Sequence, residues 1–316
     1  MLRKIDRKTL LREFGILFIF LLVIIILSIV SPTFRRPLNL LNVLKQASIT
    51  GILSFGMMLV VISGGIDLSM GSVLGLSGVV AATFAHPGEY PLIIPILVAL
   101  LVGALSGFCN GIGVAYGELP PFIITLGTMS IARGLALVIS GGVPVINISP
   151  EFGTIAADTL FEVPLLSYYL VIVVVISAFI LNKTVFGRRV YSIGGNIAAA
   201  RVSGINVKRT QIGVYIFAGL MSGIGGLLMA SRTTQGAPTA GLSYEMDAVT
   251  AVVIGGVSMS GGVGKWHGVL IGALFIAVIE NGLTIFGIDP NMKQVVKGAI
   301  IIAAVLLDVK TKGKQN

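Results

Sequence analysis

Side chains that could do chemistry are scarce in this sequence, and Asp67 has the most unusual setting among them. It lies in residues 63–72, SGGIDLSMGS, between two strongly apolar stretches. Glycines at this density favour a break in the backbone, and serine hydroxyls can satisfy the backbone groups that a break frees. We expect Asp67 to accept N–H bonds at the start of the helix that follows. Direct contact with a passing solute is the alternative, and the two roles do not exclude each other.

Motifs of the common enzyme classes are absent from the sequence. Lys265 follows Gly264, but Met259 stands where a phosphate-binding loop needs its first glycine, and Trp266 follows the lysine. The chain has one cysteine and two histidines, and no metalloprotease, serine-hydrolase or zinc-binding spacing occurs. We therefore expect no metal site and disfavour an intramembrane enzyme.

The composition predicts a membrane protein. Of the 316 residues, 55% are hydrophobic and only 11% are charged, whereas soluble domains carry about 25% charged residues. Residues 14–31 are apolar and long enough to span a bilayer, so we interpret them as a retained anchor rather than a cleaved signal peptide. The net charge of +9 comes from bases in short loops. That distribution is typical of a membrane topology signal, and we expect no nucleic-acid partner.

The apolar stretches predict the fold. A helical span needs about 20 apolar residues, and we count about ten candidates: 14–31, 47–64, 68–85, 91–116, 119–140, 164–181, 211–230, 246–260, 267–286 and 292–307. The eighth is short and rich in glycine and serine, which predicts a broken or partial helix. Many glycines are spaced by four, a pattern that lets helices pack closely in lipid. We predict an all-α polytopic bundle of about ten transmembrane helices, some of them broken, in one domain over residues 1–316.

The loop charges predict the orientation. With the N-terminus in the cytoplasm, the basic N-terminal tail, the basic loop 182–210 and the basic C-terminal tail all lie inside, while the acidic loop 141–163 lies outside. Arg35 and Arg36 are the exception, but the balance places both termini in the cytoplasm. Two five-span halves would have opposite topology, as in inverted repeats. SGGIDLSMGSVLG and IGGVSMSGGVG are weakly alike, and we leave such a repeat open.

A few charges fall within or beside the predicted spans, namely Arg133, Glu280, Lys293 and Lys297. A charge at mid-bilayer costs at least about 2.5–3.5 kcal/mol, so these side chains should face the bundle interior or water. Arg133 and Glu280 are a candidate ion pair, in which a structural role and a transport role are equally open. The set is too sparse for a proton relay, which favours a transporter driven from outside the chain.

Loop 182–210 contains a short exposed helix, predicted from the helix formers in NIAAAR and ended by Gly204. A solvated loop is the plainer interpretation, but it leaves the small residues 198–200 unexplained. Small side chains in this position suit close docking of a partner.

Four sequence blocks together resemble a known family. NIAAARVSGINV is similar to the E-A-A-x-x-x-G loop of ABC importer permeases, and three further blocks agree: SGGIDLSMGSVLGLSG, LGTMSIARGLALVISGG and PTAGLSYEMDAVTAVVIGGVSMSGGVGKWHGVLIGAL. From about residue 39 to 308 the chain resembles the permease subunits of bacterial ABC monosaccharide importers, and the ribose permeases in particular. Ile197 departs from the family pattern, which often has Glu at this position. The chain thereby loses one polar contact to the partner that a Glu could make.

The resemblance implies a mechanism and a set of partners. Two copies of the chain would form a pore in the bacterial inner membrane, two ABC ATPase domains would dock on the cytoplasmic side, and a soluble sugar-binding protein would dock outside. ATP and Mg would be used by the ATPase subunits, and this chain would bind no cofactor. The residues implied to couple the pore to the ATPase are Asn196, Ala198, Ala199, Arg201, Gly204, Ile205 and Asn206.

A sugar pathway of low affinity suits small and hydroxyl-bearing side chains. Our candidates for the pathway or the helix break are Gly65, Asp67, Ser69, Gly71, Ser72, Asn110, Thr125, Thr128 and Asn281. Each polar one could equally make a helix–helix hydrogen bond. Two alternatives remain open: an importer of the same family for another small sugar or autoinducer-2, and a stand-alone ion-coupled secondary transporter.

Overall fold

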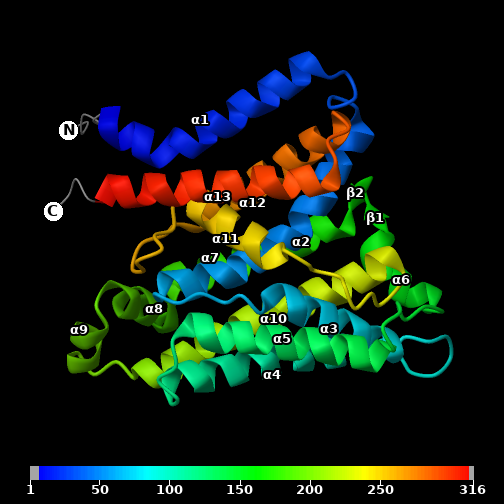
Figure 1. The fold of residues 1–316 in the computed structure, drawn as a ribbon, viewed down its shortest axis with the longest axis horizontal. Coiled ribbons are helices and arrows are strands. Elements are labelled where there is room, and N and C mark those ends of the chain that lie inside the picture. Colours follow the sequence, from blue (N-terminus) through cyan, green and yellow to red (C-terminus); the bar gives the residue numbers. More distant parts are fainter. Residues whose placement is uncertain (1–6, 313–316) are drawn as a thin grey trace.

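The computed structural model describes residues 7–312, which are almost entirely helical (Figure 1). The helices are α1 (Arg7–Val30), α2 (Pro37–Ile62), α3 (Met70–Thr83), α4 (Ile93–Ala115), α5 (Pro121–Ser140), α6 (Pro150–Ala157), α7 (Leu165–Lys183), α8 (Val185–Gly195), α9 (Ile197–Val202), α10 (Val207–Thr233), α11 (Tyr244–Ile254), α12 (Trp266–Ile285) and α13 (Pro290–Lys312). A short antiparallel hairpin, β1 (Thr159–Leu160) and β2 (Val163–Pro164), precedes α7.

Each of the ten predicted stretches contains a helix, but only six of the described helices are long and apolar enough to cross a membrane. These six are α2, α4, α5, α7, α10 and α12. Gly15–Val30 within α1 and the whole of α3 are shorter apolar helices, and α11 has only 11 residues. The all-helical membrane fold is therefore confirmed, while the count of about ten spans stays a prediction.

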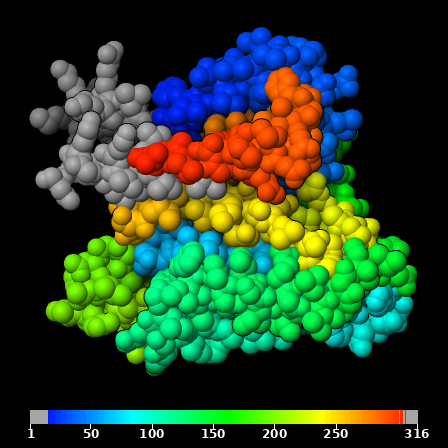
Figure 2. Space-filling view, viewed as in Figure 1, coloured from blue at the N-terminus to red at the C-terminus, as the bar shows by residue number. Residues whose placement is uncertain are grey.

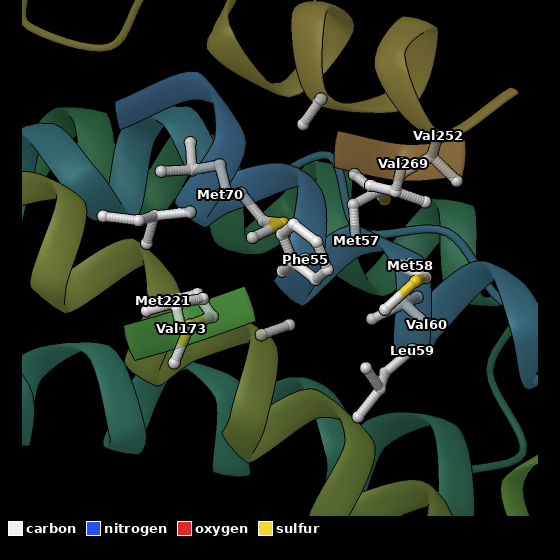
Figure 3. Close-up of a cluster of buried hydrophobic side chains, with 14 of the residues drawn as sticks. Phe55, Met57, Met58, Leu59, Val60, Met70, Val173, Met221, Val252 and Val269 are labelled. Carbon is white, nitrogen blue, oxygen red and sulfur yellow. The ribbon is translucent and has the colours of Figure 1, made fainter. Parts of the chain in front are cut away.

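Helix α2 forms the centre of the bundle. Every residue from Ala47 to Ile62 is buried, and α2 packs against α7, α10, α11 and α12. A helix that is apolar on all sides belongs in the interior, and this part of α2 carries no charged residue. Figure 3 shows Phe55 and Met58 of α2 within the main cluster of buried side chains, together with residues of α3, α7, α10, α11 and α12.

Glycines permit the closest helix contacts, as their spacing predicts. Helices α4 and α10 meet at Gly103, Gly107, Gly219 and Gly223, where a Cβ added to any of the four would collide with the backbone of the facing helix. Small residues allow such approach in lipid, where van der Waals packing drives helix association.

The two ends of the bundle differ in what they carry. The start of α1, the end of α13 and the pair α8–α9 lie at one end, whereas α6 and the β-hairpin lie at the other (Figure 1). The basic loop therefore shares a side with the start of α1 and the end of α13. Which side faces the cytoplasm stays a prediction from the charges.

Candidate functional site

Four of the predicted polar residues meet in one buried cluster. The Oδ1 atom of Asp67 accepts hydrogen bonds from the backbone N–H of Ser69 at 2.9 Å and from its hydroxyl at 2.6 Å. The Asn110 amide of α4 donates to the Ser69 hydroxyl at 2.9 Å, and the Thr128 hydroxyl of α5 donates to the Asn110 carbonyl at 2.6 Å. Asp67 is only 1% exposed. This chain of bonds joins the start of α3 to α4 and α5.

The end of α2 positions the cluster. Ser63 closes the helix, Gly64 adopts the left-handed conformation with φ of +84°, and the Gly65 N–H donates back to the Val60 carbonyl at 3.0 Å. Such a glycine-terminated cap stops a helix sharply. Gly65 also leaves room for Tyr215 of α10, whose hydroxyl would collide with a Cβ there. Asp67 then turns the chain toward α3, because its bond to the Ser69 N–H satisfies one of the free donors at the start of that helix.

The other predicted lining residues lie elsewhere or make local bonds. Ser72 is buried within α3, and Gly71 packs so closely against Gly241 and Glu245 that a Cβ would overlap both. The Thr125 hydroxyl donates to the Pro121 carbonyl inside α5. Asn281 of α12 exchanges two amide hydrogen bonds with Asn39 of α2, at 2.8 and 3.0 Å. The role of all these residues in a pathway stays a prediction.

The predicted pair of Arg133 and Glu280 is wrong. Arg133 of α5 instead donates to the backbone carbonyls of Pro238 and, at 2.9 Å, Ala240. Glu280 of α12 forms an ion pair with Lys297 of α13. Lys297 also pairs with Asp247 of α11 at 2.9 Å, and the Asp247 side chain is only 4% exposed. Glu280 and Arg133 thus have partners, but on other segments of the chain and not each other.

A second glycine break follows α11 and shares two hydrogen-bond features with the first, although its polar turn comes one residue sooner after the left-handed glycine. Gly256 adopts φ of +82°, and the Val257 N–H donates to the Val252 carbonyl at 3.1 Å. Two residues further along, the Ser258 hydroxyl accepts the Ser260 N–H at 3.2 Å, as Asp67 accepts that of Ser69. The weak sequence likeness between the two stretches therefore corresponds to a shared local structure.

The predicted helix in loop 182–210 is present as α9, and its ends are capped. The Asn196 side chain accepts the Ala199 N–H at 2.9 Å, and the Asn206 side chain accepts the Arg209 N–H at 3.0 Å at the start of α10. Gly204 ends the turn after α9 with φ of +79°. Ile205 packs against the small cluster of Ile193, Ala200 and Val207.

The exposed face of α9 differs in one respect from the predicted patch. Ala198, Ala199 and Arg201 are exposed, but Ala200 is buried against the bundle. Val202, which the sequence analysis passed over, is 90% exposed. The signal available in the sequence was an apolar residue within a basic loop, which the structure shows to be exposed.

The end of α8 contacts both glycine breaks, which sequence reasoning also missed. A Cβ on Gly194 would collide with the Ile62 carbonyl at the end of α2 and with the backbone N–H of Gly262. That N–H donates to the Ile62 carbonyl at 2.8 Å. The Tyr191 hydroxyl donates to the Gly264 carbonyl at 2.8 Å, and burial raises the pKa of Tyr191, which keeps the donor proton in place. The loop with α8 and α9 is thus in direct contact with the end of α2 and with the segment that follows α11.

Comparisons with known proteins agree on one kind of molecule. Residues 39–305 match the family model described as branched-chain amino acid transport system / permease component. The ribose import permease protein RbsC of Bacillus subtilis (strain 168) is 45% identical over 294 residues, 92% of this chain and 91% of that protein. RbsC of Escherichia coli (strain K12) is 39% identical over 312 residues, 98% of this chain and 97% of that protein.

A second group of relatives carries a different name. The galactose/methyl galactoside import permease protein MglC of Escherichia coli (strain K12) is 38% identical over 325 residues, 97% of this chain and 97% of that protein. No solved structure matches the chain.

Proposed function

The chain belongs to the branched-chain amino acid transport system / permease component family, and we propose from this that it is the permease subunit of an ABC importer for ribose. It is a multi-pass protein of the bacterial inner membrane, and it provides the path for a monosaccharide rather than the ATPase. The observation that carries the proposal is the identity of 45% with a ribose import permease over 92% of the chain.

The partners in this proposal are two ATPase subunits, a soluble sugar-binding protein and a second copy of the chain. The α9 segment suits the ATPase contact, because it is capped at both ends and offers exposed Ala198, Ala199 and Val202 on a basic loop. Absence of a phosphate-binding loop from the sequence is consistent with ATP hydrolysis in a separate subunit.

Galactose is the second candidate substrate, favoured by the identity of 38% with a galactose/methyl galactoside permease. The buried Asp67 cluster does not separate the two sugars, because hydroxyls and amides can hydrogen-bond either one. A stand-alone ion-coupled transporter is less favoured, since Glu280 and Asp247 both pair with Lys297, and Arg133 bonds to backbone carbonyls.

Sugar-stimulated ATP hydrolysis in proteoliposomes tests the proposal. The chain is reconstituted with its ATPase and its binding protein, and ribose is compared with galactose. Val202→Glu should abolish stimulation by the sugar-loaded binding protein and weaken capture of the ATPase, because it places a charge on the exposed apolar tip of α9 without changing the buried contacts. Phe161→Glu is the matched control for ATPase capture, since Phe161 is 87% exposed on the hairpin loop at the opposite end of the bundle.

The outcomes separate the candidates. Two results together would support the proposal. Ribose should stimulate hydrolysis and uptake, and capture of the ATPase should be lost in Val202→Glu but kept in Phe161→Glu. Stimulation by galactose alone would replace the substrate and keep the mechanism. Uptake by the chain without any ATPase, driven by an ion gradient, would overturn it.

A further inference from the structure

Residues 234–243, between α10 and α11, form an irregular segment deep in the bundle. Gly236, at its outer end, lies against Val79 and Ala82 of α3, whereas Gly241 lies against Gly71 and Leu74, near the start of the same helix. From residue 82 to residue 71 a helix descends about 16 Å at 1.5 Å per residue. The segment therefore penetrates about half the thickness of the membrane.

Helix α11 completes the crossing that this segment begins. Its 11 residues span about 16 Å, so the segment and the helix together are about as long as the hydrocarbon core is thick, roughly 30 Å. The first turns of α3 and α11 touch each other, because a Cβ on Gly71 would overlap the Glu245 side chain. The sequence analysis placed the eighth span at 246–260; the crossing instead comprises the irregular segment and α11.

The segment is exposed on one face of the molecule. Thr239 is exposed, and Leu242 and Met246 are 60% and 45% exposed. Figure 2 shows this part of the chain, in yellow and gold, uncovered between α13 in orange and red and the helices α4 and α5 in teal and green. Arg133 of α5 holds the segment from one side through the carbonyls of Pro238 and Ala240.

An exposed irregular backbone at this depth cannot face lipid. The N–H groups of Thr239 and Leu242 have no hydrogen-bond acceptor among the described residues, and an unsatisfied group in hydrocarbon costs several kcal/mol. Non-helical backbone is tolerated in a membrane only when it is buried in protein or lines a water-filled cavity. Water or a second chain must therefore cover this face.

The conformation of the two ends of the segment points to function rather than to simple packing. Thr234 and Ser243 both adopt left-handed backbone angles, with φ of +49° and +67°, and this region is unfavourable for a side chain, most of all a β-branched one. Strain of this kind persists where the surrounding structure enforces it, typically at functional sites. Between these ends the chain reads QGAPTAGL, in which most side chains are small, one carries a hydroxyl and none is charged.

We propose that residues 234–243 and the first turn of α11 line the water-filled sugar pathway, on the face where a second copy of the chain closes it. The small uncharged side chains and free N–H groups offer weak hydrogen bonds to sugar hydroxyls, which allows passage without tight binding. This inference rests on the proposed function, and it identifies the face that the transported solute meets.

Single-cysteine labelling in the assembled importer tests the proposal. Cys109 is the only cysteine in the sequence, so Cys109→Ser gives a background for Leu242→Cys and Thr239→Cys. The matched control is Leu101→Cys, because Leu101 of α4 is 56% exposed on an apolar helix face, against 60% for Leu242. A water-soluble methanethiosulfonate reagent should modify Leu242→Cys about tenfold or more faster than Leu101→Cys, since the reactive thiolate forms in water and not in lipid.

The outcomes are distinct from those of the transport assay. Fast labelling of Leu242→Cys and Thr239→Cys that added ribose or ATP alters would support the pathway. The pathway proposal would be overturned if Leu242→Cys were labelled as slowly as Leu101→Cys in every nucleotide state while transport was intact. It would also be overturned if Leu242→Cys formed oxidative cross-links between two copies of the chain but was not labelled at all. Fast labelling in a complex that does not transport sugar would instead count against the proposed function and leave a water-filled face in place.

Discussion

Two irregular segments connect buried helices in this molecule, residues 63–69 between α2 and α3 and residues 234–243 between α10 and α11, and they are held in different ways. The residues that join α2 to α3 are closed off: Asp67 and Ser69 are each 1% exposed, and both are hydrogen-bonded. The segment that joins α10 to α11 is open, with Thr239 exposed and free N–H groups on its backbone. An irregular segment between membrane helices can thus be a rigid connection when its polar groups are already paired. It can be a surface that meets a solute when those groups are free.

The means of fixation also differ between the two regions. Neutral hydroxyl and amide groups from α4 and α5 hold the first break around a single carboxylate. Charged side chains hold the second region, which comprises residues 234–243 and α11: Arg133 reaches from α5 to the carbonyls of the segment, and Lys297 reaches from α13 to Asp247 of α11. We therefore expect the second region to be the more sensitive to loss of a single side chain.

Loss of the Lys297 side chain should have the largest effect. Lys297→Met leaves the Asp247 carboxylate, 4% exposed, without a cation, and breaking a buried ion pair costs about 3–5 kcal/mol. The melting temperature of the detergent-solubilised chain should fall sharply, and less protein should be recovered from membranes.

A second substitution separates the charge from the packing. Lys297→Met combined with Asp247→Asn removes the uncompensated charge and should recover part of the loss. If the double variant is no more stable than Lys297→Met, the ion pair does not hold α11 and the contrast between the two regions fails.

Removal of the Asp67 carboxylate should have the next largest effect. Asp67→Ala leaves the buried Ser69 N–H without its acceptor, and each buried group left unsatisfied costs about 1–3 kcal/mol. Asp67→Asn keeps one acceptor oxygen and should lose less stability, as measured by thermal unfolding followed by size-exclusion chromatography. Equal stability of both variants with the parent, together with loss of sugar uptake, would mean that Asp67 meets the solute and that the first break is not merely a rigid connection.

The sequence was sufficient to predict the structural features that depend on residues close together in the chain. Apolar length predicted the helices, and the glycines and serines of residues 63–72 predicted the first break. Gly204 marked the end of α9 because its position needs a left-handed backbone. These features are local, so their physical causes lie within a few residues of one another.

The partners of the charged and amide groups could not be predicted in the same way. Asn39 and Asn281 pair across 242 positions, and Arg133 bonds to carbonyls rather than to the acid that seemed available in Glu280. Backbone carbonyls carry no signature in the sequence. The contact of α8 with both breaks depends on the absence of a side chain at Gly194. The sequence shows this glycine, but only the folded structure shows which backbone lies against it.

Substitution of Gly194 tests whether the end of α2 and the segment after α11 respond together to loop 182–210, because Gly194 contacts both Ile62 and Gly262. Gly194→Ala would force a Cβ onto the Ile62 carbonyl, and overpacking typically costs about 1–3 kcal/mol. Gly195→Ala is the matched control, since a Cβ there meets nothing within 4 Å. We expect Gly194→Ala to lower both stability and sugar uptake while Gly195→Ala behaves as the parent; the same result for both would exclude tight contact at this junction.

The smallest structural change, Tyr191→Phe, should be the sharpest test of that junction. It removes only the hydroxyl that bonds to Gly264 at 2.8 Å, which contributes about 0.5–1.5 kcal/mol, so the fold should survive. Tyr168→Phe is its control, because the Tyr168 hydroxyl makes a comparable 3.0 Å bond to the Leu160 carbonyl on the hairpin at the opposite end. If α8 links the ATPase to the segment after α11, Tyr191→Phe should lower the number of sugars carried per ATP hydrolysed and leave basal hydrolysis unchanged, whereas Tyr168→Phe should alter neither. An unchanged ratio in Tyr191→Phe would confine the link to the contacts of Gly194 with Ile62 and Gly262.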